Sequence, residues 1–184
     1  MILIVTEGKK TEREYLHAVH KDLGTGQYVL RIVEAGVPSS CVDEALRLRN
    51  DPELPAPEQV WCVFDVDAHP RVDDSVDRCS ECNIRVAVSN PCIELWLLLH
   101  HQNFGQSKHR HTVQRLLREH TPDSDKDVDY RRHYRGKVPE AMRRADRLME
   151  VAEVSDPKRP HQKNPSTGMM RLLRAILPST AFED

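Results

Sequence analysis

Three carboxylates that follow apolar segments are the side chains best suited to carry chemistry. Glu7 comes just after the apolar run at residues 2–5, and Asp65 and Asp67 lie at and past the end of a second run at residues 60–64. Short, wholly apolar runs are typical of parallel strands that are buried on both faces. Because ligands of open α/β sheets bind outside the carboxyl ends of the strands, we expect these carboxylates to meet at one edge of a sheet.

Such a cluster favours metal-ion chemistry. Neighbouring carboxylates repel one another and are costly to desolvate, so they persist where a cation or a proton neutralises them. Their hard oxygen atoms suit Mg²⁺ or Mn²⁺, ions that serve phosphoryl chemistry. The i, i+2 spacing of Asp65 and Asp67 directs both side chains to the same side of an extended chain. A lone Asp-x-Asp also occurs in ordinary strand-ending turns, and that alternative stays open.

Glu94 is a fourth candidate, in a helix expected over residues 92–101 with Asn90 as its cap and Pro91 at its first position. The rest of this helix is apolar nearly all round, so we expect it to be buried. The helix dipole stabilises a carboxylate by only roughly 0.3–1 kcal/mol, so a buried Glu94 needs a partner or solvent. The partner is either a metal ion, bound directly or through water, or an arginine in a structural ion pair.

The elements that must position these residues alternate along the first half of the chain. Besides the two apolar runs, the sequence predicts strands at residues 28–34 and 84–88 and helices at 12–23, 39 or 40 to 49 (capped by Ser39 or Ser40) and 72–82. This alternation predicts an α/β fold with a mostly parallel central sheet flanked by helices. After residue 102 the sequence predicts helices at 112–120, 138–154 and 166–177 and no strong strand. We expect a single domain over residues 1–184, with an α/β core at 1–105 and a helical, basic extension at 106–184 packed on it.

The net charge of −2 conceals an uneven distribution of charge. Residues 1–105 hold 10 Lys and Arg against 17 Asp and Glu, whereas residues 106–184 hold 17 against 12. An acidic half beside a basic half suits a metal centre that works next to a polyanion, although two ordinary solvated surfaces would give the same counts. The longest apolar run, residues 95–99, is too short to span a membrane. Five cysteines favour reduced thiols over a disulfide framework, so we expect a cytoplasmic protein with no membrane partner.

Short motifs spread over nearly the whole chain resemble a known family. They read Val5-Thr6-Glu7-Gly8-Lys9-Lys10-Thr11-Glu12, Phe64-Asp65-Val66-Asp67-Ala68-His69, Ser89-Asn90-Pro91-Cys92-Ile93-Glu94-Leu95-Trp96-Leu97-Leu98-Leu99-His100 and Asn164-Pro165-Ser166-Thr167. This pattern resembles RloB-like proteins, which are associated with bacterial restriction and abortive-infection loci. The resemblance implies a Toprim-like fold, in which a Glu after the first strand and an Asp-x-Asp after a later strand bind divalent metal. The Gly that often follows the Toprim Asp-x-Asp is absent here, because Ala68 and His69 follow instead.

The chemistry that the resemblance implies is metal-assisted phosphodiester hydrolysis by a nuclease, the effector of an anti-phage system. Asp65, Asp67 and Glu94 would hold Mg²⁺ or Mn²⁺, and Glu7 would bind metal or act as an acid or base. A basic side chain near the phosphate would help, and Lys137 and Lys163 are the candidates. The implied partners are nucleic acid, either DNA or RNA, and an ATPase of the defence locus; homo-oligomerisation is left open.

Other interpretations of the same residues remain. The chain could be a Toprim-like module that binds nucleic acid or a partner without cleaving, or a phosphatase with Asp65 as nucleophile and Asp67 as acid, although the usual Gly-Thr after the second Asp is absent. His69 either assists proton transfer or faces solvent. Cys79-x-x-Cys82 either contributes to a zinc site or packs inward from a helix.

Overall fold

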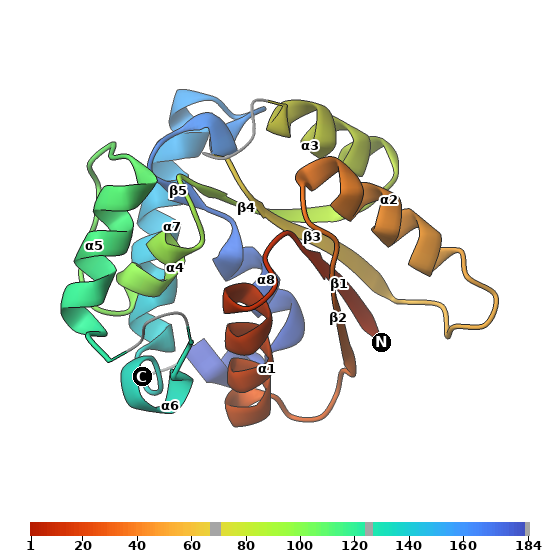
Figure 1. Ribbon diagram of the computed structural model, residues 1–184, viewed down its shortest axis with the longest axis horizontal. Helices are drawn as coiled ribbons and strands as arrows, with labels where there is room; N and C mark the ends of the chain where they lie inside the picture. The colour runs from red at the N-terminus through yellow and green to blue at the C-terminus, as the bar shows by residue number, and fades with distance from the viewer. Residues whose placement is uncertain (67–70, 124–126, 183–184) are drawn as a thin grey trace.

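The computed structural model describes residues 1–66, 71–123 and 127–182, and its five strands form one sheet in the order β2-β1-β3-β4-β5 (Figure 1). The strands are β1 (Ile2–Thr6), β2 (Leu30–Glu34), β3 (Gln59–Asp65), β4 (Arg85–Asn90) and β5 (Ser166–Thr167). The first four run parallel, and β5 pairs antiparallel with the end of β4. The predicted α/β fold with a mostly parallel sheet is therefore confirmed.

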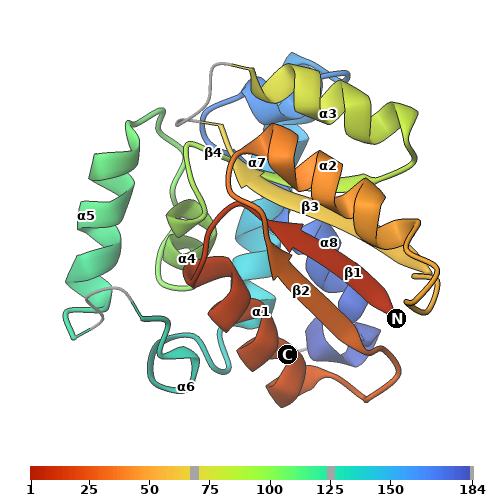
Figure 2. The same cartoon turned by 45° about the vertical axis from the view of Figure 1, so that its right-hand side comes forward.

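Helices cover both faces of this sheet. Those in the described residues are α1 (Thr11–Leu23), α2 (Pro38–Arg49), α3 (Val72–Glu81), α4 (Glu94–Leu99), α5 (Arg110–His120), α6 (Tyr130–His133), α7 (Val138–Ser155) and α8 (Met169–Ile176), with 3₁₀ turns at Pro160–Gln162 and Ser179–Phe182. Figure 2 shows α2 and α3 on one side of the sheet and α1, α7 and α8 on the other. None of the helices in the described part of the chain is long and apolar enough to cross a membrane.

Burial on both faces explains why the strand sequences are wholly apolar. Ile2 and Ile4 of β1 pack into the core beneath α1, α4, α7 and α8, whereas Leu3 and Val5 pack into the core beneath α2 and α3. Successive side chains of a strand point to opposite faces, so a strand covered on both sides needs an apolar residue at every position. The prediction of doubly buried strands at residues 2–5 and 60–64 is confirmed.

The start of α4 differs from the prediction. Asn90 does not cap a helix: it is the last residue of β4, where it pairs with Ser166, and the peptide bond to Pro91 is cis. Its side-chain NH₂ group donates to the carbonyls of His161 and Gln162, at 3.0 and 3.2 Å, and the residue at the N-cap position of α4 is Ile93. The helix begins at Glu94 instead, and its residues from Leu95 to Leu99 are buried as predicted.

Two further local predictions are wrong. Ser166 and Thr167 form β5 rather than the start of a helix, because their backbone pairs with Asn90 and Ser89 of β4, and the helix α8 begins at Met169. Neither Ser39 nor Ser40 caps α2, which begins at Pro38 with the proline in its first turn. Both differences arise from backbone pairing and proline geometry rather than from side-chain periodicity.

Candidate active site

Glu7 and Asp65 lie together at the carboxyl ends of β1 and β3, which are neighbours in the sheet. The backbone N–H of Asp65 donates to Oε2 of Glu7 at 3.0 Å, and the N–H of Glu7 donates to the carbonyl of Val63 at 2.9 Å. The pairing of the two strands thus brings these two acids to one edge of the sheet, as the sequence predicts. Asp67 and His69 lie outside the described residues.

Asp65 is buried, with 7% of its surface exposed, in a strongly acidic environment. Burial raises the pKa of its carboxyl well above the usual value, and the negative charges of Glu12, Glu94 and Glu7 raise it further. Four carboxylates therefore act on one another at this edge of the sheet. We call Glu7, Glu12, Asp65 and Glu94 the acidic cluster.

Glu12 is the member of the acidic cluster to which the sequence analysis gave no role. It lies in the first turn of α1 with 4% of its surface exposed, and burial raises its pKa, as do the charges of Glu94 and Glu7. Hydrogen bonds from its own backbone N–H and from that of Gly8 act in the opposite direction. The buried positions of α1 are Glu12, Tyr15, Leu16 and Val19, at i, i+3, i+4 and i+7. A carboxylate on that otherwise apolar stripe was the available signal.

Glu94 approaches the acidic cluster from α4. Gln114 of α5 donates its amide to Oε1 of Glu94 at 2.9 Å. Oε2 is buried and accepts no hydrogen bond from a nitrogen or oxygen donor among the described residues, and the Glu94 side chain also interacts with the thiol of Cys92. An unpartnered, buried carboxylate oxygen is costly, so this oxygen is the atom of the cluster most in need of a positively charged or hydrogen-bonding ligand.

Arg110 is a cation that acts on this cluster. It is the first residue of α5, is half-buried, and its charge lowers the pKa of Asp65 in opposition to the carboxylates. Arg110 shares a helical stripe with Val113, Gln114 and Leu117, so α5 presents the guanidinium and the Gln114 amide on one face. The sequence showed Arg110 only as part of a basic run and gave no reason to separate it from its neighbours.

The two lysines considered from sequence lie in the segments before and after α7. Lys137 precedes α7, and its ammonium lies 3.3 Å from Nδ1 of His101. Lys163 is exposed in the segment between α7 and β5. The assignment of Lys137 as a catalytic residue stays a prediction.

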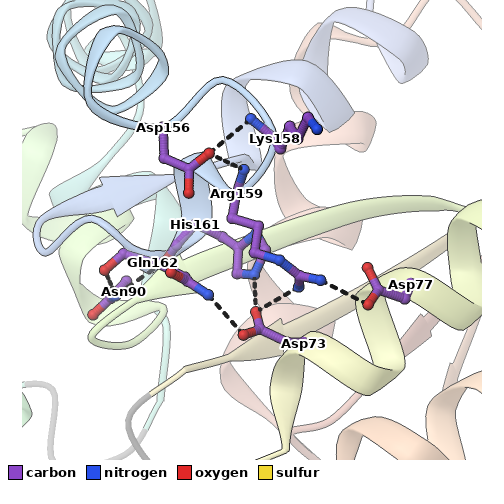
Figure 3. Close-up of polar contacts among 8 residues, drawn as sticks. All are labelled: Asp73, Asp77, Asn90, Asp156, Lys158, Arg159, His161 and Gln162. Atoms are coloured by element: carbon purple, nitrogen blue, oxygen red, sulfur yellow. Dashed lines mark hydrogen bonds and ion pairs between the residues drawn. The ribbon is translucent and has the colours of Figure 1, made fainter.

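A polar network fixes the segment before Lys163 against α3 and the end of β4 (Figure 3). His161 and Gln162 bond to the two carboxylate oxygens of Asp73 at 2.6 and 2.7 Å. Arg159 bridges Asp73 and Asp77 at 3.2 and 2.8 Å. Because Asp73 lies in the first turn of α3, this network holds the start of that helix against the end of β4.

The donors of the acidic cluster fit a hard divalent cation in chemistry. Carboxylate oxygens are the ligands that Mg²⁺ and Mn²⁺ prefer, and the buried oxygen of Glu94 lacks another partner among the described residues. Within residues 1–66, 71–123 and 127–182, no three His, Cys, Asp or Glu side chains stand in an arrangement that would already hold an ion. The predicted ligand Asp67 is outside those residues.

Four of the five cysteines (Cys41, Cys62, Cys79 and Cys82) lie on the side of the sheet covered by α2 and α3, whereas Cys92 belongs to the core on the other side. Cys79 of α3 is fully buried and forms a side-chain hydrogen bond with Cys62 of β3, whose thiol in turn bonds to the carbonyl of Cys41 at 3.6 Å. Cys82 is only half-buried. The inward packing of Cys79 matches the simpler of the two interpretations of the Cys-x-x-Cys motif.

Comparison with known proteins assigns the chain to a family. The family model described as RloB-like protein matches residues 2–176, so the chain belongs to the RloB-like family. No curated protein matches the sequence, and no solved structure matches it either.

Proposed function

We propose that this RloB-like protein is a divalent-metal-dependent nuclease that hydrolyses phosphodiester bonds, and that it serves as a cytoplasmic effector of anti-phage defence. The observation that carries the proposal is the burial of Asp65 among the carboxylates of Glu7, Glu12 and Glu94 at the carboxyl ends of the parallel strands. Family membership supports the defence role, because RloB-like proteins are associated with restriction and abortive-infection loci.

The acidic cluster favours an enzyme over a structural site. Four mutually repelling carboxylates, two of them with raised pKa, store an electrostatic cost that an ion pair or a solvated surface would not carry. Such perturbed groups concentrate at functional sites, because the free energy is recovered when the ligand binds. A bound Mg²⁺ or Mn²⁺, held by Asp65, Glu94 and Asp67, would supply Lewis-acid charge to the scissile phosphate.

The protein's own side chains would then orient the substrate. The Arg110 guanidinium, whose charge lowers the pKa of Asp65, would bind a phosphate oxygen with paired N–H groups and stabilise negative charge as it develops. Gln114 fixes Glu94 through its amide, so that Oε1 is held and Oε2 is left for the ligand. Glu7 accepts the Asp65 N–H and so ties the two strand ends together; it is also the candidate acid or base.

The burial of Asp65 speaks against the phosphatase alternative. A nucleophilic aspartate must reach the phosphorus atom, whereas Asp65 is 7% exposed and surrounded by other carboxylates. A module that binds nucleic acid or a partner without cleaving would use the same site, so only an experiment that measures cleavage separates it from the nuclease.

The test compares the wild type with Asp65→Ala, Asp67→Ala and a control, Glu150→Gln, at an exposed position of α7. Single- and double-stranded DNA and RNA are incubated with Mg²⁺, Mn²⁺ or EDTA, and Mn²⁺ binding is measured by calorimetry. We expect cleavage that needs metal, falls by at least about 10²-fold in both aspartate variants and persists in the control. Nucleic-acid binding without cleavage by the wild type would establish the binding module, and turnover of phosphomonoesters through an aspartyl-phosphate would establish the phosphatase.

A further inference from the structure

A pocket of about 440 Å³ lies beside the acidic cluster, between the N-terminal turn of α1 and the helices α4 and α5. Glu12 and Glu94 both line it, so the pocket opens directly from the candidate active site. Its volume falls within the range of sites that hold one small organic group. A double helix does not fit such a space, whereas a single nucleotide does.

The wall of this pocket is apolar where the acidic cluster ends. Leu97, Leu117, Val128 and Tyr134 line it, and all but the half-buried Val128 are core residues. Tyr134 is held by edge-to-face contacts with Tyr15 and His100, at ring-centroid distances of 6.2 and 5.2 Å, so this wall is rigid. Flat apolar faces of a ligand suit such a wall, because base stacking on apolar and aromatic side chains does not depend on sequence.

The lining also includes cationic side chains. Lys9, Lys10 and Arg118 belong to it, and all three are exposed. Lys9 lies 3.8 Å from a carboxylate oxygen of Glu34. Lys10 forms an ion pair with Asp127. A polyanion whose base occupies the pocket would carry its neighbouring phosphates past these three cations. The pocket thus offers a partner to each part of a nucleotide within a strand: metal-suited acids for the scissile phosphate, an apolar wall for the base, and basic side chains for the neighbouring phosphates.

We propose that this pocket receives one unpaired base next to the scissile phosphate, so that the substrate is single-stranded nucleic acid. The proposal deepens the proposed function and rests on it for the position of the scissile bond. Paired bases are stacked inside a duplex and reach such a pocket only by being extruded, at the cost of unpairing and unstacking. Selectivity for unpaired strands then follows from the shape of the pocket and not from hydrogen-bond readout of sequence.

Binding in EDTA tests the proposal without cleavage. Fluorescence anisotropy measures the affinity of the protein for labelled single-stranded DNA and RNA oligonucleotides and for blunt duplexes of the same sequences. We expect at least one single-stranded form to bind about tenfold or more tightly than its duplex. Val128→Trp fills the pocket at a half-buried position and should weaken single-strand binding about tenfold or more, whereas Val151→Trp, at an exposed position of α7, should not.

Arg118→Ala provides a second readout that does not depend on filling the pocket. We expect weaker single-strand binding and a salt dependence whose log–log slope falls by about 0.7. Arg115→Ala is its matched control, because Arg115 lies three residues earlier on α5 and pairs with Glu119. Duplex binding as tight as single-strand binding, or unchanged affinity in both Val128→Trp and Arg118→Ala, would overturn the proposal.

These outcomes are distinct from those that test the nuclease. Cleavage of duplexes with no preference for single strands would leave the nuclease standing and remove the pocket's role. Selective single-strand binding through Val128 and Arg118, in a protein that cleaves nothing, would support the pocket and remove the nuclease.

Discussion

Replacing Gly8 by alanine tests whether the position of the Glu12 carboxylate matters. A Cβ at Gly8 would lie 2.6 Å from Oε1 and 2.7 Å from Cδ of Glu12, and closer still to Oε2. Ordinary contact begins at 3.4 Å, so the carboxylate must move by about 0.8 Å or more. It is the far end of a flexible side chain and can move without disturbing the backbone. The movement breaks the hydrogen bond from the Gly8 N–H.

The expected result is a large loss of activity with little loss of stability. Glu12 acts on Asp65 through its charge, and a misplacement of about 1 Å near the reacting groups of an active site lowers rates about 10²-fold. The loss of the hydrogen bond from Gly8 to the Glu12 carboxylate is offset because the displaced carboxylate is less buried. We therefore expect the free energy of unfolding to change by less than about 1 kcal/mol. Metal-dependent cleavage and thermal unfolding are measured on the same preparations. Gly105→Ala is the matched control, because a Cβ there meets nothing within 4 Å.

A double-mutant cycle identifies the route of the effect. If Gly8→Ala acts through Glu12, it should add little to the loss already caused by Glu12→Gln. Full activity in Gly8→Ala would refute the reasoning, and so would losses that multiply in the double variant. In the second case Gly8 would act by another route, such as direct approach of its backbone to the substrate.

Three further predictions follow from the same site and from the thiols. Asp65→Asn should stabilise the metal-free protein at pH 7–8 by on the order of 1–3 kcal/mol while abolishing cleavage, because it removes a buried charge. The pKa of Asp65 is raised in the folded state, so the wild type regains stability as pH falls and the carboxylate takes up a proton. In EDTA, the difference between the thermal unfolding midpoints of Asp65→Asn and the wild type should therefore shrink towards pH 4. A difference that stays constant or grows would contradict the burial of the Asp65 charge. Arg110→Ala should lower cleavage about 10²-fold or more, whereas Lys108→Ala, two residues earlier, should not, since the contacts of Lys108 with Asn164 are made by its backbone; equal losses would indicate general phosphate attraction. Of the five cysteines only Cys82 is not fully buried, so a thiol reagent should modify one thiol rapidly in the native protein and the other four on unfolding. If Cys82 reacted only after zinc was chelated, the zinc interpretation would be favoured instead.

The strands and the acids that follow them could be predicted because their signals are local. A strand buried on both faces is apolar along the part that the helices cover, and the first charged residue after it marks the edge of the sheet. For β1 and β3 that logic placed Glu7 and Asp65 at one edge, where they share a hydrogen bond. The prediction that Asn90 caps a helix, which also used only local sequence, is wrong, because its partners His161 and Gln162 come from a distant segment.

The sequence alone determined the α/β class, the burial of the parallel strands on both faces and the position of acids at the strand ends, since each depends on the pattern within a single element. Only the tertiary structure decided which other charges join them. Glu12 and Arg110 are brought to Asp65 by the packing of α1 and α5, and nothing in the spacing between residues 12, 65 and 110 encodes that distance. The position of Glu12 on the buried stripe of its helix was visible, but the neighbour that the stripe would meet was not. Arg110 lay outside the helix predicted at residues 112–120, and only the structure makes it the first residue of α5. The charges that act on Asp65 come from segments far apart in the sequence, so only the packing of those segments in the fold shows the electrostatic character of the site.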